Sequence, residues 1–159
     1  MTEETKDLDI SLLDMDIDSI EDLPGFEVPH NGEYMLQLKT TLKNIKGRTC
    51  VETSFEMLEC IKKDNDSDPD TVAGSKFSSL YTVKGDGKNA EEDKEQVRKG
   101  LGYLKLLLAD VAETTGQGNL MILIRDVVAD CTVLGTVKRR VDAEDKEKVY
   151  GSVKNMRLA

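Results

Sequence analysis

The fold is decided by the stretch GEYMLQLKTTLKNIKGRTCVETSFEMLECI, residues 32–61. Side chains alternate in character from Glu33 to Leu42 and again from Val51 to Ile61, which is the period of a β-strand with one buried face. One face of the first strand carries Tyr34, Leu36, Leu38, Thr40 and Leu42. The residues 44–47 between the two runs are typical of a turn, so we expect two long antiparallel strands.

The rest of the chain continues this pattern with one interruption. We expect a third strand at 76–83, a long helix at 90–113, a short helix at 120–128, and a terminal hairpin of strands 133–141 and 148–158. The long helix is indicated by an apolar stripe formed by Val97, Leu101, Leu104, Leu108 and Val111. For residues 120–128 a helix is favoured over a strand, although a brief apolar run fits both.

Three strands, a long helix, a short helix and two strands predict a mainly β (α+β) fold. The expected architecture is a five-stranded OB-like barrel with the long helix between strands three and four. Residues 1–29 are predicted to be an acidic, flexible tail and linker, and residues 30–159 the binding domain.

The negative charge of the chain is concentrated in its tail. The net charge is −9, and residues 1–22 contain nine acidic residues and a single lysine, so the remaining 137 residues are close to neutral. Basic side chains can therefore still gather on one face of the domain. Within the tail, Ile10, Leu13, Ile17 and Ile20 have helical spacing, which favours a short amphipathic helix when a partner is bound.

The sequence offers little material for catalysis, so we expect a binding protein and not an enzyme. The only histidine, His30, lies between Pro29 and Asn31, where a solvent-exposed linker residue is the expected role. Gly85-Asp86-Gly87-Lys88 and Gly100-Leu101-Gly102 lack the spacing of nucleotide-binding loops.

No cofactor or metal is expected. Asp64, Asp66, Asp68 and Asp70 resemble the start of an EF-hand loop, but proline stands at 69 and Ser75 takes the place of the bidentate glutamate. An enzyme using this loop and a metal is the least favoured function. Cys50, Cys60 and Cys131 form neither a CxxC pair nor an even set, which indicates reduced thiols.

Basic and aromatic residues interleave on several predicted strands. Binding of single strands requires positive charge along the phosphate path and rings on which bases can stack. The candidate DNA-binding residues are Lys39, Lys43, Arg48, Lys76, Phe77, Tyr81, Lys84, Lys138, Arg139, Arg140, Tyr150, Lys154 and Arg157. The alternative for these positions is that Phe77 and Tyr81 are core residues and the lysines keep the surface soluble.

The order of elements resembles the phage-encoded OB-fold single-stranded DNA-binding proteins. The resemblance runs through GEYMLQLKTTLKNIKG (32–47), SFEMLECI (54–61), EEDKEQVRKGLGYLKLLLADVAE (91–113), LIRDVVADCTVLGTVKRRVD (123–142) and VYGSVKNMRLA (149–159). It implies a protein that coats single-stranded DNA during phage replication, recombination or repair without covalent chemistry. Many such proteins carry an acidic tail at the C-terminus, whereas here the acidic tail is N-terminal.

Partners and location follow from the same features. We expect single-stranded DNA as ligand, and the tail either competes for the DNA site or docks replication or recombination proteins. A phage accessory adaptor that binds a polypeptide is the alternative function, and homodimerisation is left open. No apolar run approaches the roughly 20 residues of a membrane span, and the N-terminus lacks signal-peptide character, so the expected location is the cytoplasm, the host's if the protein is phage-encoded.

Overall fold

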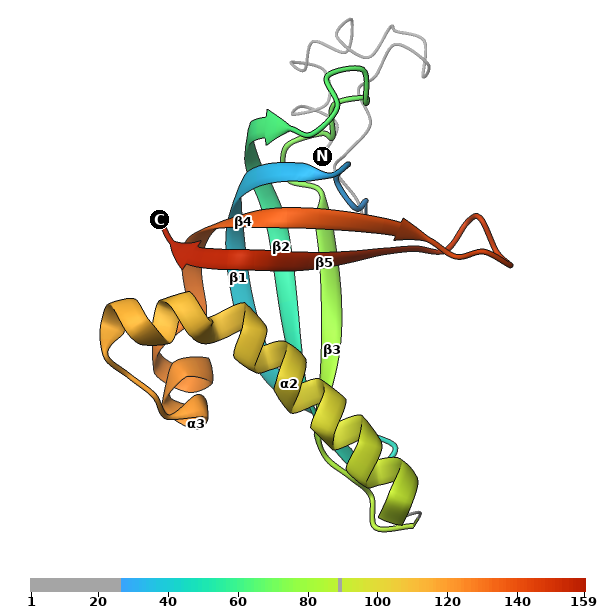
Figure 1. Cartoon of the computed structure of the whole chain (residues 1–159), viewed down its shortest axis with the longest axis vertical. Coiled ribbons are helices and arrows are strands. Elements are labelled where there is room, and N and C mark those ends of the chain that lie inside the picture. Colours follow the sequence, from blue (N-terminus) through green and yellow to red (C-terminus); the bar gives the residue numbers. More distant parts are fainter. Residues whose placement is uncertain (1–26, 89) are drawn as a thin grey trace, which may run out of the picture.

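The computed structural model describes residues 27–88 and 90–159 (Figure 1). The predicted tail helix, and all of the tail before Glu27, lie outside the described residues. The strands are β1 (Gly32–Ile45), β2 (Arg48–Lys63), β3 (Lys76–Lys84), β4 (Asp130–Val141) and β5 (Val149–Leu158). The helical elements are α2 (Ala90–Thr115), α3 (Leu120–Ile122) and the π-helical turn η3 (Leu123–Val127). The prediction of five strands and one long helix is confirmed.

The five strands form one antiparallel sheet in the order β3-β2-β1-β4-β5. The sheet is strongly bent, so that β4 and β5 cross steeply over β2 and β3 (Figure 1). Register shifts between Glu33 and Tyr34 and between Met35 and Leu36 interrupt the β1–β2 ladder. Both shifts leave an extra residue in β2, Ile61 and Leu58, and a bulge bends the strand that carries it, which contributes to the bend of the sheet.

The alternation of side chains in residues 32–61 determines which face of the sheet is buried. Leu36 and Leu38 of β1 are fully buried, opposite Met57 and Phe55 of β2. The ring of Phe55 stacks on Phe77 of β3, with ring centroids 5.2 Å apart. The core is therefore aliphatic with a small aromatic cluster, as expected for a chain without tryptophan.

The strands form an open sheet, so the prediction that they close into a barrel is wrong. β3 and β5 are its two edges and share no hydrogen-bonded ladder. They meet where Ser79 Oγ donates a hydrogen bond to the Gly151 carbonyl at 3.1 Å. Gly151 permits this approach, because a Cβ there would come within 3.0 Å of the ring of Phe77 on β3.

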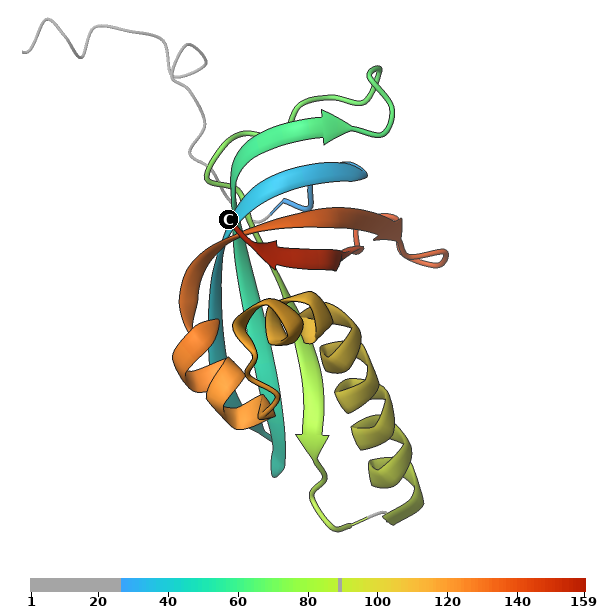
Figure 2. The same ribbon diagram turned by 60° about the vertical axis from the view of Figure 1, so that its left-hand side comes forward.

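The predicted position of the long helix also needs correction. α2 follows β3 and precedes β4 along the chain, but in space it packs against β3 and β5, the edge strands (Figure 2). The close approach to β3 depends on Gly100, which is buried, because a Cβ at this position would overlap the Thr82 carbonyl oxygen. The helix ends before Gly116, whose φ of 73° suits the left-handed conformation of a helix cap.

Within the part of the chain that the structure describes, no helix combines the length and apolar character required to cross a membrane.

Candidate nucleic-acid interface between the edge strands

Two open clefts adjoin at the contact between the edge strands, and we call them together the β3–β5 groove. It consists of two clefts of about 760 and 680 Å³, both of which are lined by Ser79 and Gly151. The groove is lined by Glu27, Val28, Lys76, Phe77, Ser78, Ser79, Leu80, Tyr81, Tyr103, Leu106, Leu107, Lys138, Arg139, Arg140, Glu147, Val149, Tyr150, Gly151, Ser152, Val153, Lys154 and Asn155.

The lining is rich in positive charge. It contains five cationic side chains, Lys76, Lys138, Arg139, Arg140 and Lys154, but only two acidic ones, Glu27 and Glu147. Lys138 pairs with Asp64 at 3.2 Å, and Lys76 lies 4.0 Å from Glu56, and both pairs are solvent-exposed. Among residues 27–88 and 90–159, no carboxylate forms an ion pair with Arg139, Arg140 or Lys154. Arg140 and Lys154 are therefore available to an anionic ligand, whereas the guanidinium of Arg139 is engaged by His30.

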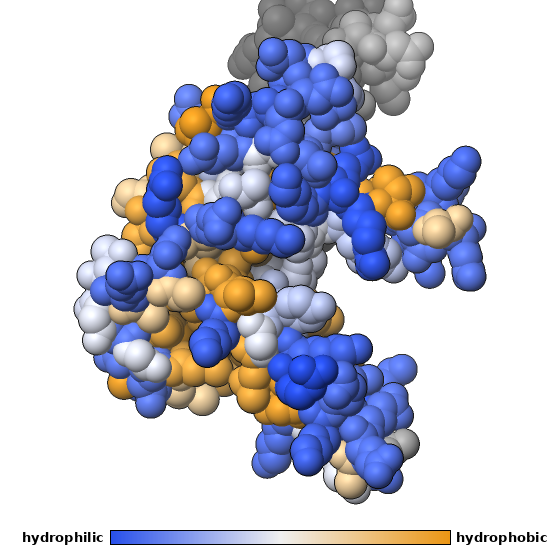
Figure 3. Space-filling model, viewed as in Figure 1, coloured by the Kyte–Doolittle hydropathy of each residue, from blue (hydrophilic) through white to orange (hydrophobic). Residues whose placement is uncertain are grey.

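Two exposed tyrosines line the same groove from different elements. Tyr103 of α2 is 59% exposed and Tyr150 of β5 is 45% exposed. The guanidinium carbon of Arg140 lies 5.0 Å from the centre of the Tyr150 ring, within cation–π range. Figure 3 shows hydrophobic surface where α2 meets β5, bordered by hydrophilic surface, and Leu106, 73% exposed, belongs to this part of the groove.

Arg139 is held in place by the segment before β1. Its backbone N–H donates to Asn31 Oδ1 at 2.6 Å, and its Nη1 lies 2.7 Å from His30 Nε2. The expectation that His30 is a solvent-exposed linker residue is wrong, because its side chain is only 24% exposed and lies between Arg139 and Asp68. His30 therefore helps to position a groove cation.

The structure gathers eight of the thirteen candidate residues in the groove. These are Lys76, Phe77, Tyr81, Lys138, Arg139, Arg140, Tyr150 and Lys154. Phe77 is only 4% exposed and stacks on Phe55, so the core alternative describes it. Tyr81 is half-buried and packs against the core, and this burial raises the pKa of its hydroxyl.

The other five candidates lie outside the groove. They are Lys39, Lys43, Arg48, Lys84 and Arg157. Three of them are engaged in ion pairs: Lys43 with Glu52 at 2.9 Å, Arg157 with Glu33 at 3.2 Å, and Arg48 with the buried Asp93 at 3.3 Å. The Arg48 pair joins the start of β2 to the first turn of α2, which is a structural role.

Tyr103 is a groove residue that sequence reasoning missed. It lies on α2 beside the apolar stripe, where a single tyrosine does not by itself indicate a binding site. A usable signal is the spacing of Tyr103 and Leu106, two large apolar side chains one helical turn apart that do not belong to the buried stripe. Such a pair on the outer side of a helix indicates a contact surface.

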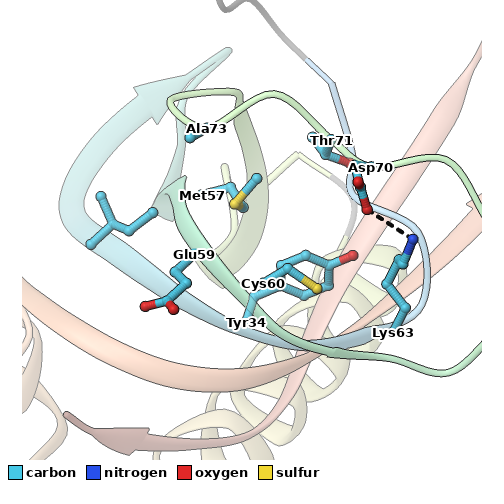
Figure 4. A pocket seen from close by; sticks show the side chains of 9 residues that line it. Tyr34, Met57, Glu59, Cys60, Lys63, Asp70, Thr71 and Ala73 are labelled. Atoms are coloured by element: carbon cyan, nitrogen blue, oxygen red, sulfur yellow. Dashed lines mark ion pairs between the residues drawn. The ribbon is translucent and has the colours of Figure 1, made fainter. Parts of the chain in front are cut away.

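A smaller cavity of about 280 Å³ lies at the far end of β2, next to the loop that follows it (Figure 4). Lys63 and Asp70 form a 2.8 Å ion pair at its rim, and the Lys63 ammonium holds the pKa of Asp70 below its ordinary value. The Tyr34 hydroxyl donates to the His30 carbonyl at 2.8 Å, and burial raises the pKa of this tyrosine to about 12. The two oppositely charged side chains of this cavity, Lys63 and Asp70, neutralise one another, which makes it a weaker candidate than the groove for a charged ligand.

Acidic and thiol groups show no metal-binding arrangement in the described ranges 27–88 and 90–159. Two carboxylates of the segment that resembles the start of an EF-hand loop, Asp64 and Asp70, pair with lysines. Cys50 is buried, Cys131 half-buried and Cys60 exposed, and all three are free thiols.

No family model, no curated protein and no solved structure matches this chain. Its class is therefore defined by its own fold: an open, five-stranded antiparallel sheet with one long helix packed against both edge strands.

Proposed function

We propose that the β3–β5 groove binds single-stranded DNA without strong sequence preference, and that the protein does no covalent chemistry. The observation that carries this proposal is the presence of five cationic side chains and two exposed tyrosines along one groove. In the cytoplasm, the host's if the protein is phage-encoded, such binding would protect single strands during replication, recombination or repair.

The chemistry of the groove fits a single strand better than a duplex. Lysine and arginine side chains neutralise phosphates of either form and release their counterions. Exposed rings such as Tyr103 and Tyr150 gain stacking energy only from bases that are free of a complementary strand. A ligand that uses both the cations and the rings is therefore single-stranded.

The direct test is fluorescence anisotropy with labelled oligo-dT and with a duplex of the same length, each at two salt concentrations. We expect the full chain to bind oligo-dT more tightly than the duplex, with an affinity that falls as salt rises. Absence of oligo-dT binding at low salt would falsify the proposed function.

Removal of groove cations should reduce the salt dependence of binding. Arg140→Gln and Lys154→Gln each remove a cation that lines the groove. For each phosphate that is no longer neutralised, the slope of log K against log salt should fall by about 0.7. Lys39→Gln is the matched control, since Lys39 is an exposed β1 lysine outside the groove. An equal change of slope in the control would place the DNA elsewhere on the surface.

The acidic tail joins the described chain at the groove itself. The Glu27 N–H donates to the Lys76 carbonyl at 3.0 Å, and Glu27 and Val28 line one cleft. Deletion of residues 1–22, which carry nine acidic residues and one lysine, should therefore tighten oligo-dT binding at low salt and have less effect at high salt. Unchanged affinity in the titration would argue for the other role, docking of replication or recombination proteins.

A second function is favoured by the apolar part of the groove. Leu80 and Leu106 are 52% and 73% exposed, and among the residues that the structure describes the outer edges of β3 and β5 have no ladder partner. These are features of a surface that takes up an extended polypeptide. A phage accessory adaptor is the function that follows if the oligonucleotide titrations show no binding.

A further inference from the structure

β5 contains a residue in an unusual backbone conformation inside the groove. Asn155 has a φ of 54°, a region that side-chain-bearing residues seldom adopt, although asparagine tolerates it better than most. The described non-glycine residue that shares this feature is Lys46, which with Gly47 forms the tight turn between β1 and β2. Asn155 lies within a strand, so no chain reversal explains its conformation.

The conformation marks a β-bulge. Thr136 of β4 is opposite Lys154, but Leu134 is opposite Arg157, so β5 contains one residue more than β4 over this interval. The side chains of Val153 and Met156 are both buried, with Lys154 and Asn155 exposed between them. Regular alternation would place residues 153 and 156 on opposite faces. The bulge therefore presents two consecutive side chains, Lys154 and Asn155, to the groove.

The Asn155 amide is not used by the fold. Its side chain makes no hydrogen bond within residues 27–88 and 90–159, although it shares a cleft with Tyr103, Tyr150 and Lys154. A primary amide offers one acceptor and two donors, which match an exocyclic amine next to a ring nitrogen. Adenine presents this pattern on two edges, N6 with N1 and N6 with N7, and cytosine on one, N4 with N3; asparagine is the residue that commonly pairs with adenine.

We propose that Asn155 reads a base edge and gives the groove a modest preference for adenine. This inference rests on the proposed function and specifies its ligand. The groove then has three parts with different tasks: the cations hold phosphates, Tyr103 and Tyr150 hold the planes of bases, and Asn155 contacts the edge of one base.

The test compares the affinities of the full chain for labelled oligo-dA and oligo-dT of equal length, for the natural protein and for Asn155→Gly. Glycine accepts a positive φ without strain, so this variant removes the amide and keeps the bulge. Because a bidentate amide–base contact discriminates between bases by about tenfold or more, we expect the dA-to-dT affinity ratio to fall by about tenfold.

Two further variants separate base reading from charge. Asn155→Asp tolerates the same backbone conformation but cannot donate two hydrogen bonds, and it should lower the dA-to-dT ratio as glycine does. Lys154→Gln should weaken both oligonucleotides equally and leave the ratio unchanged.

The outcomes are distinct. An equal dA-to-dT ratio in the natural protein and in Asn155→Gly would overturn the role of Asn155 while leaving single-strand binding intact. Failure of the natural protein to bind either oligonucleotide would overturn the proposed function and the base preference together.

Discussion

Replacing Gly100 by alanine is expected to destabilise the protein by roughly 2–3 kcal/mol, because the added methyl group overlaps the Thr82 carbonyl oxygen and forces α2 away from β3. The same change at Gly102 is expected to stabilise it by about 1 kcal/mol, since alanine is the better helix former. Gly102 lies on the same helix and is exposed, and a Cβ added there would meet no neighbouring atom within 4 Å.

The pair of variants controls for helix propensity, because both changes are glycine to alanine in the interior of α2. Urea unfolding followed by circular dichroism gives both free energies of unfolding, and no tryptophan signal is required. If Gly100→Ala were as stable as Gly102→Ala, α2 would not pack on β3 as closely as described.

Removal of both exposed tyrosine rings is expected to produce the largest loss of DNA affinity. Each base stacked on an aromatic ring contributes about 1–3 kcal/mol, so Tyr103→Ala combined with Tyr150→Ala should weaken oligo-dT binding by roughly 100-fold or more. The two tyrosines come from α2 and β5, so their joint effect also tests whether both walls of the groove contact the same strand.

Phenylalanine substitutions at the same positions are the matched controls. They keep the ring and lose the hydroxyl, and should retain most of the affinity. The salt dependence should be unchanged in the alanine variants, because no cation is removed. A small effect of the double alanine variant, with salt dependence intact, would show that the cations bind the ligand without base stacking.

The elements of this fold were predictable because their signals are local. The alternation in residues 32–61 and the apolar stripe of the long helix each depend on residues close in sequence, and the structure contains the corresponding strands and helix. Closure of the barrel was not predictable in this way. It depends on whether β3 and β5 approach each other along their length, and the approach is governed by bulges and by the seating of α2 through Gly100.

The cationic residues of the candidate site could be predicted from the sequence, whereas its exposed aromatic residues could be predicted only in part. Arg139, Arg140 and Tyr150 belong to the terminal hairpin, whose position at the sheet edge brings them into the groove. Arg48 looks equivalent in sequence, but Asp93, a distant residue, engages it. Phe77 faces the core and Tyr103 faces solvent, and which way each points depends on packing between elements distant in sequence.

The bulge at Asn155 also has a consequence for self-association. An uninterrupted edge strand can serve as a template on which another molecule adds a strand, the first step toward fibrous aggregates. The extra residue breaks the regular hydrogen-bonding repeat of β5 between Lys154 and Arg157, and the exposed Lys76 and Lys84 place charge at the two ends of β3. An open sheet can thereby keep its edges accessible to a ligand while discouraging polymerisation.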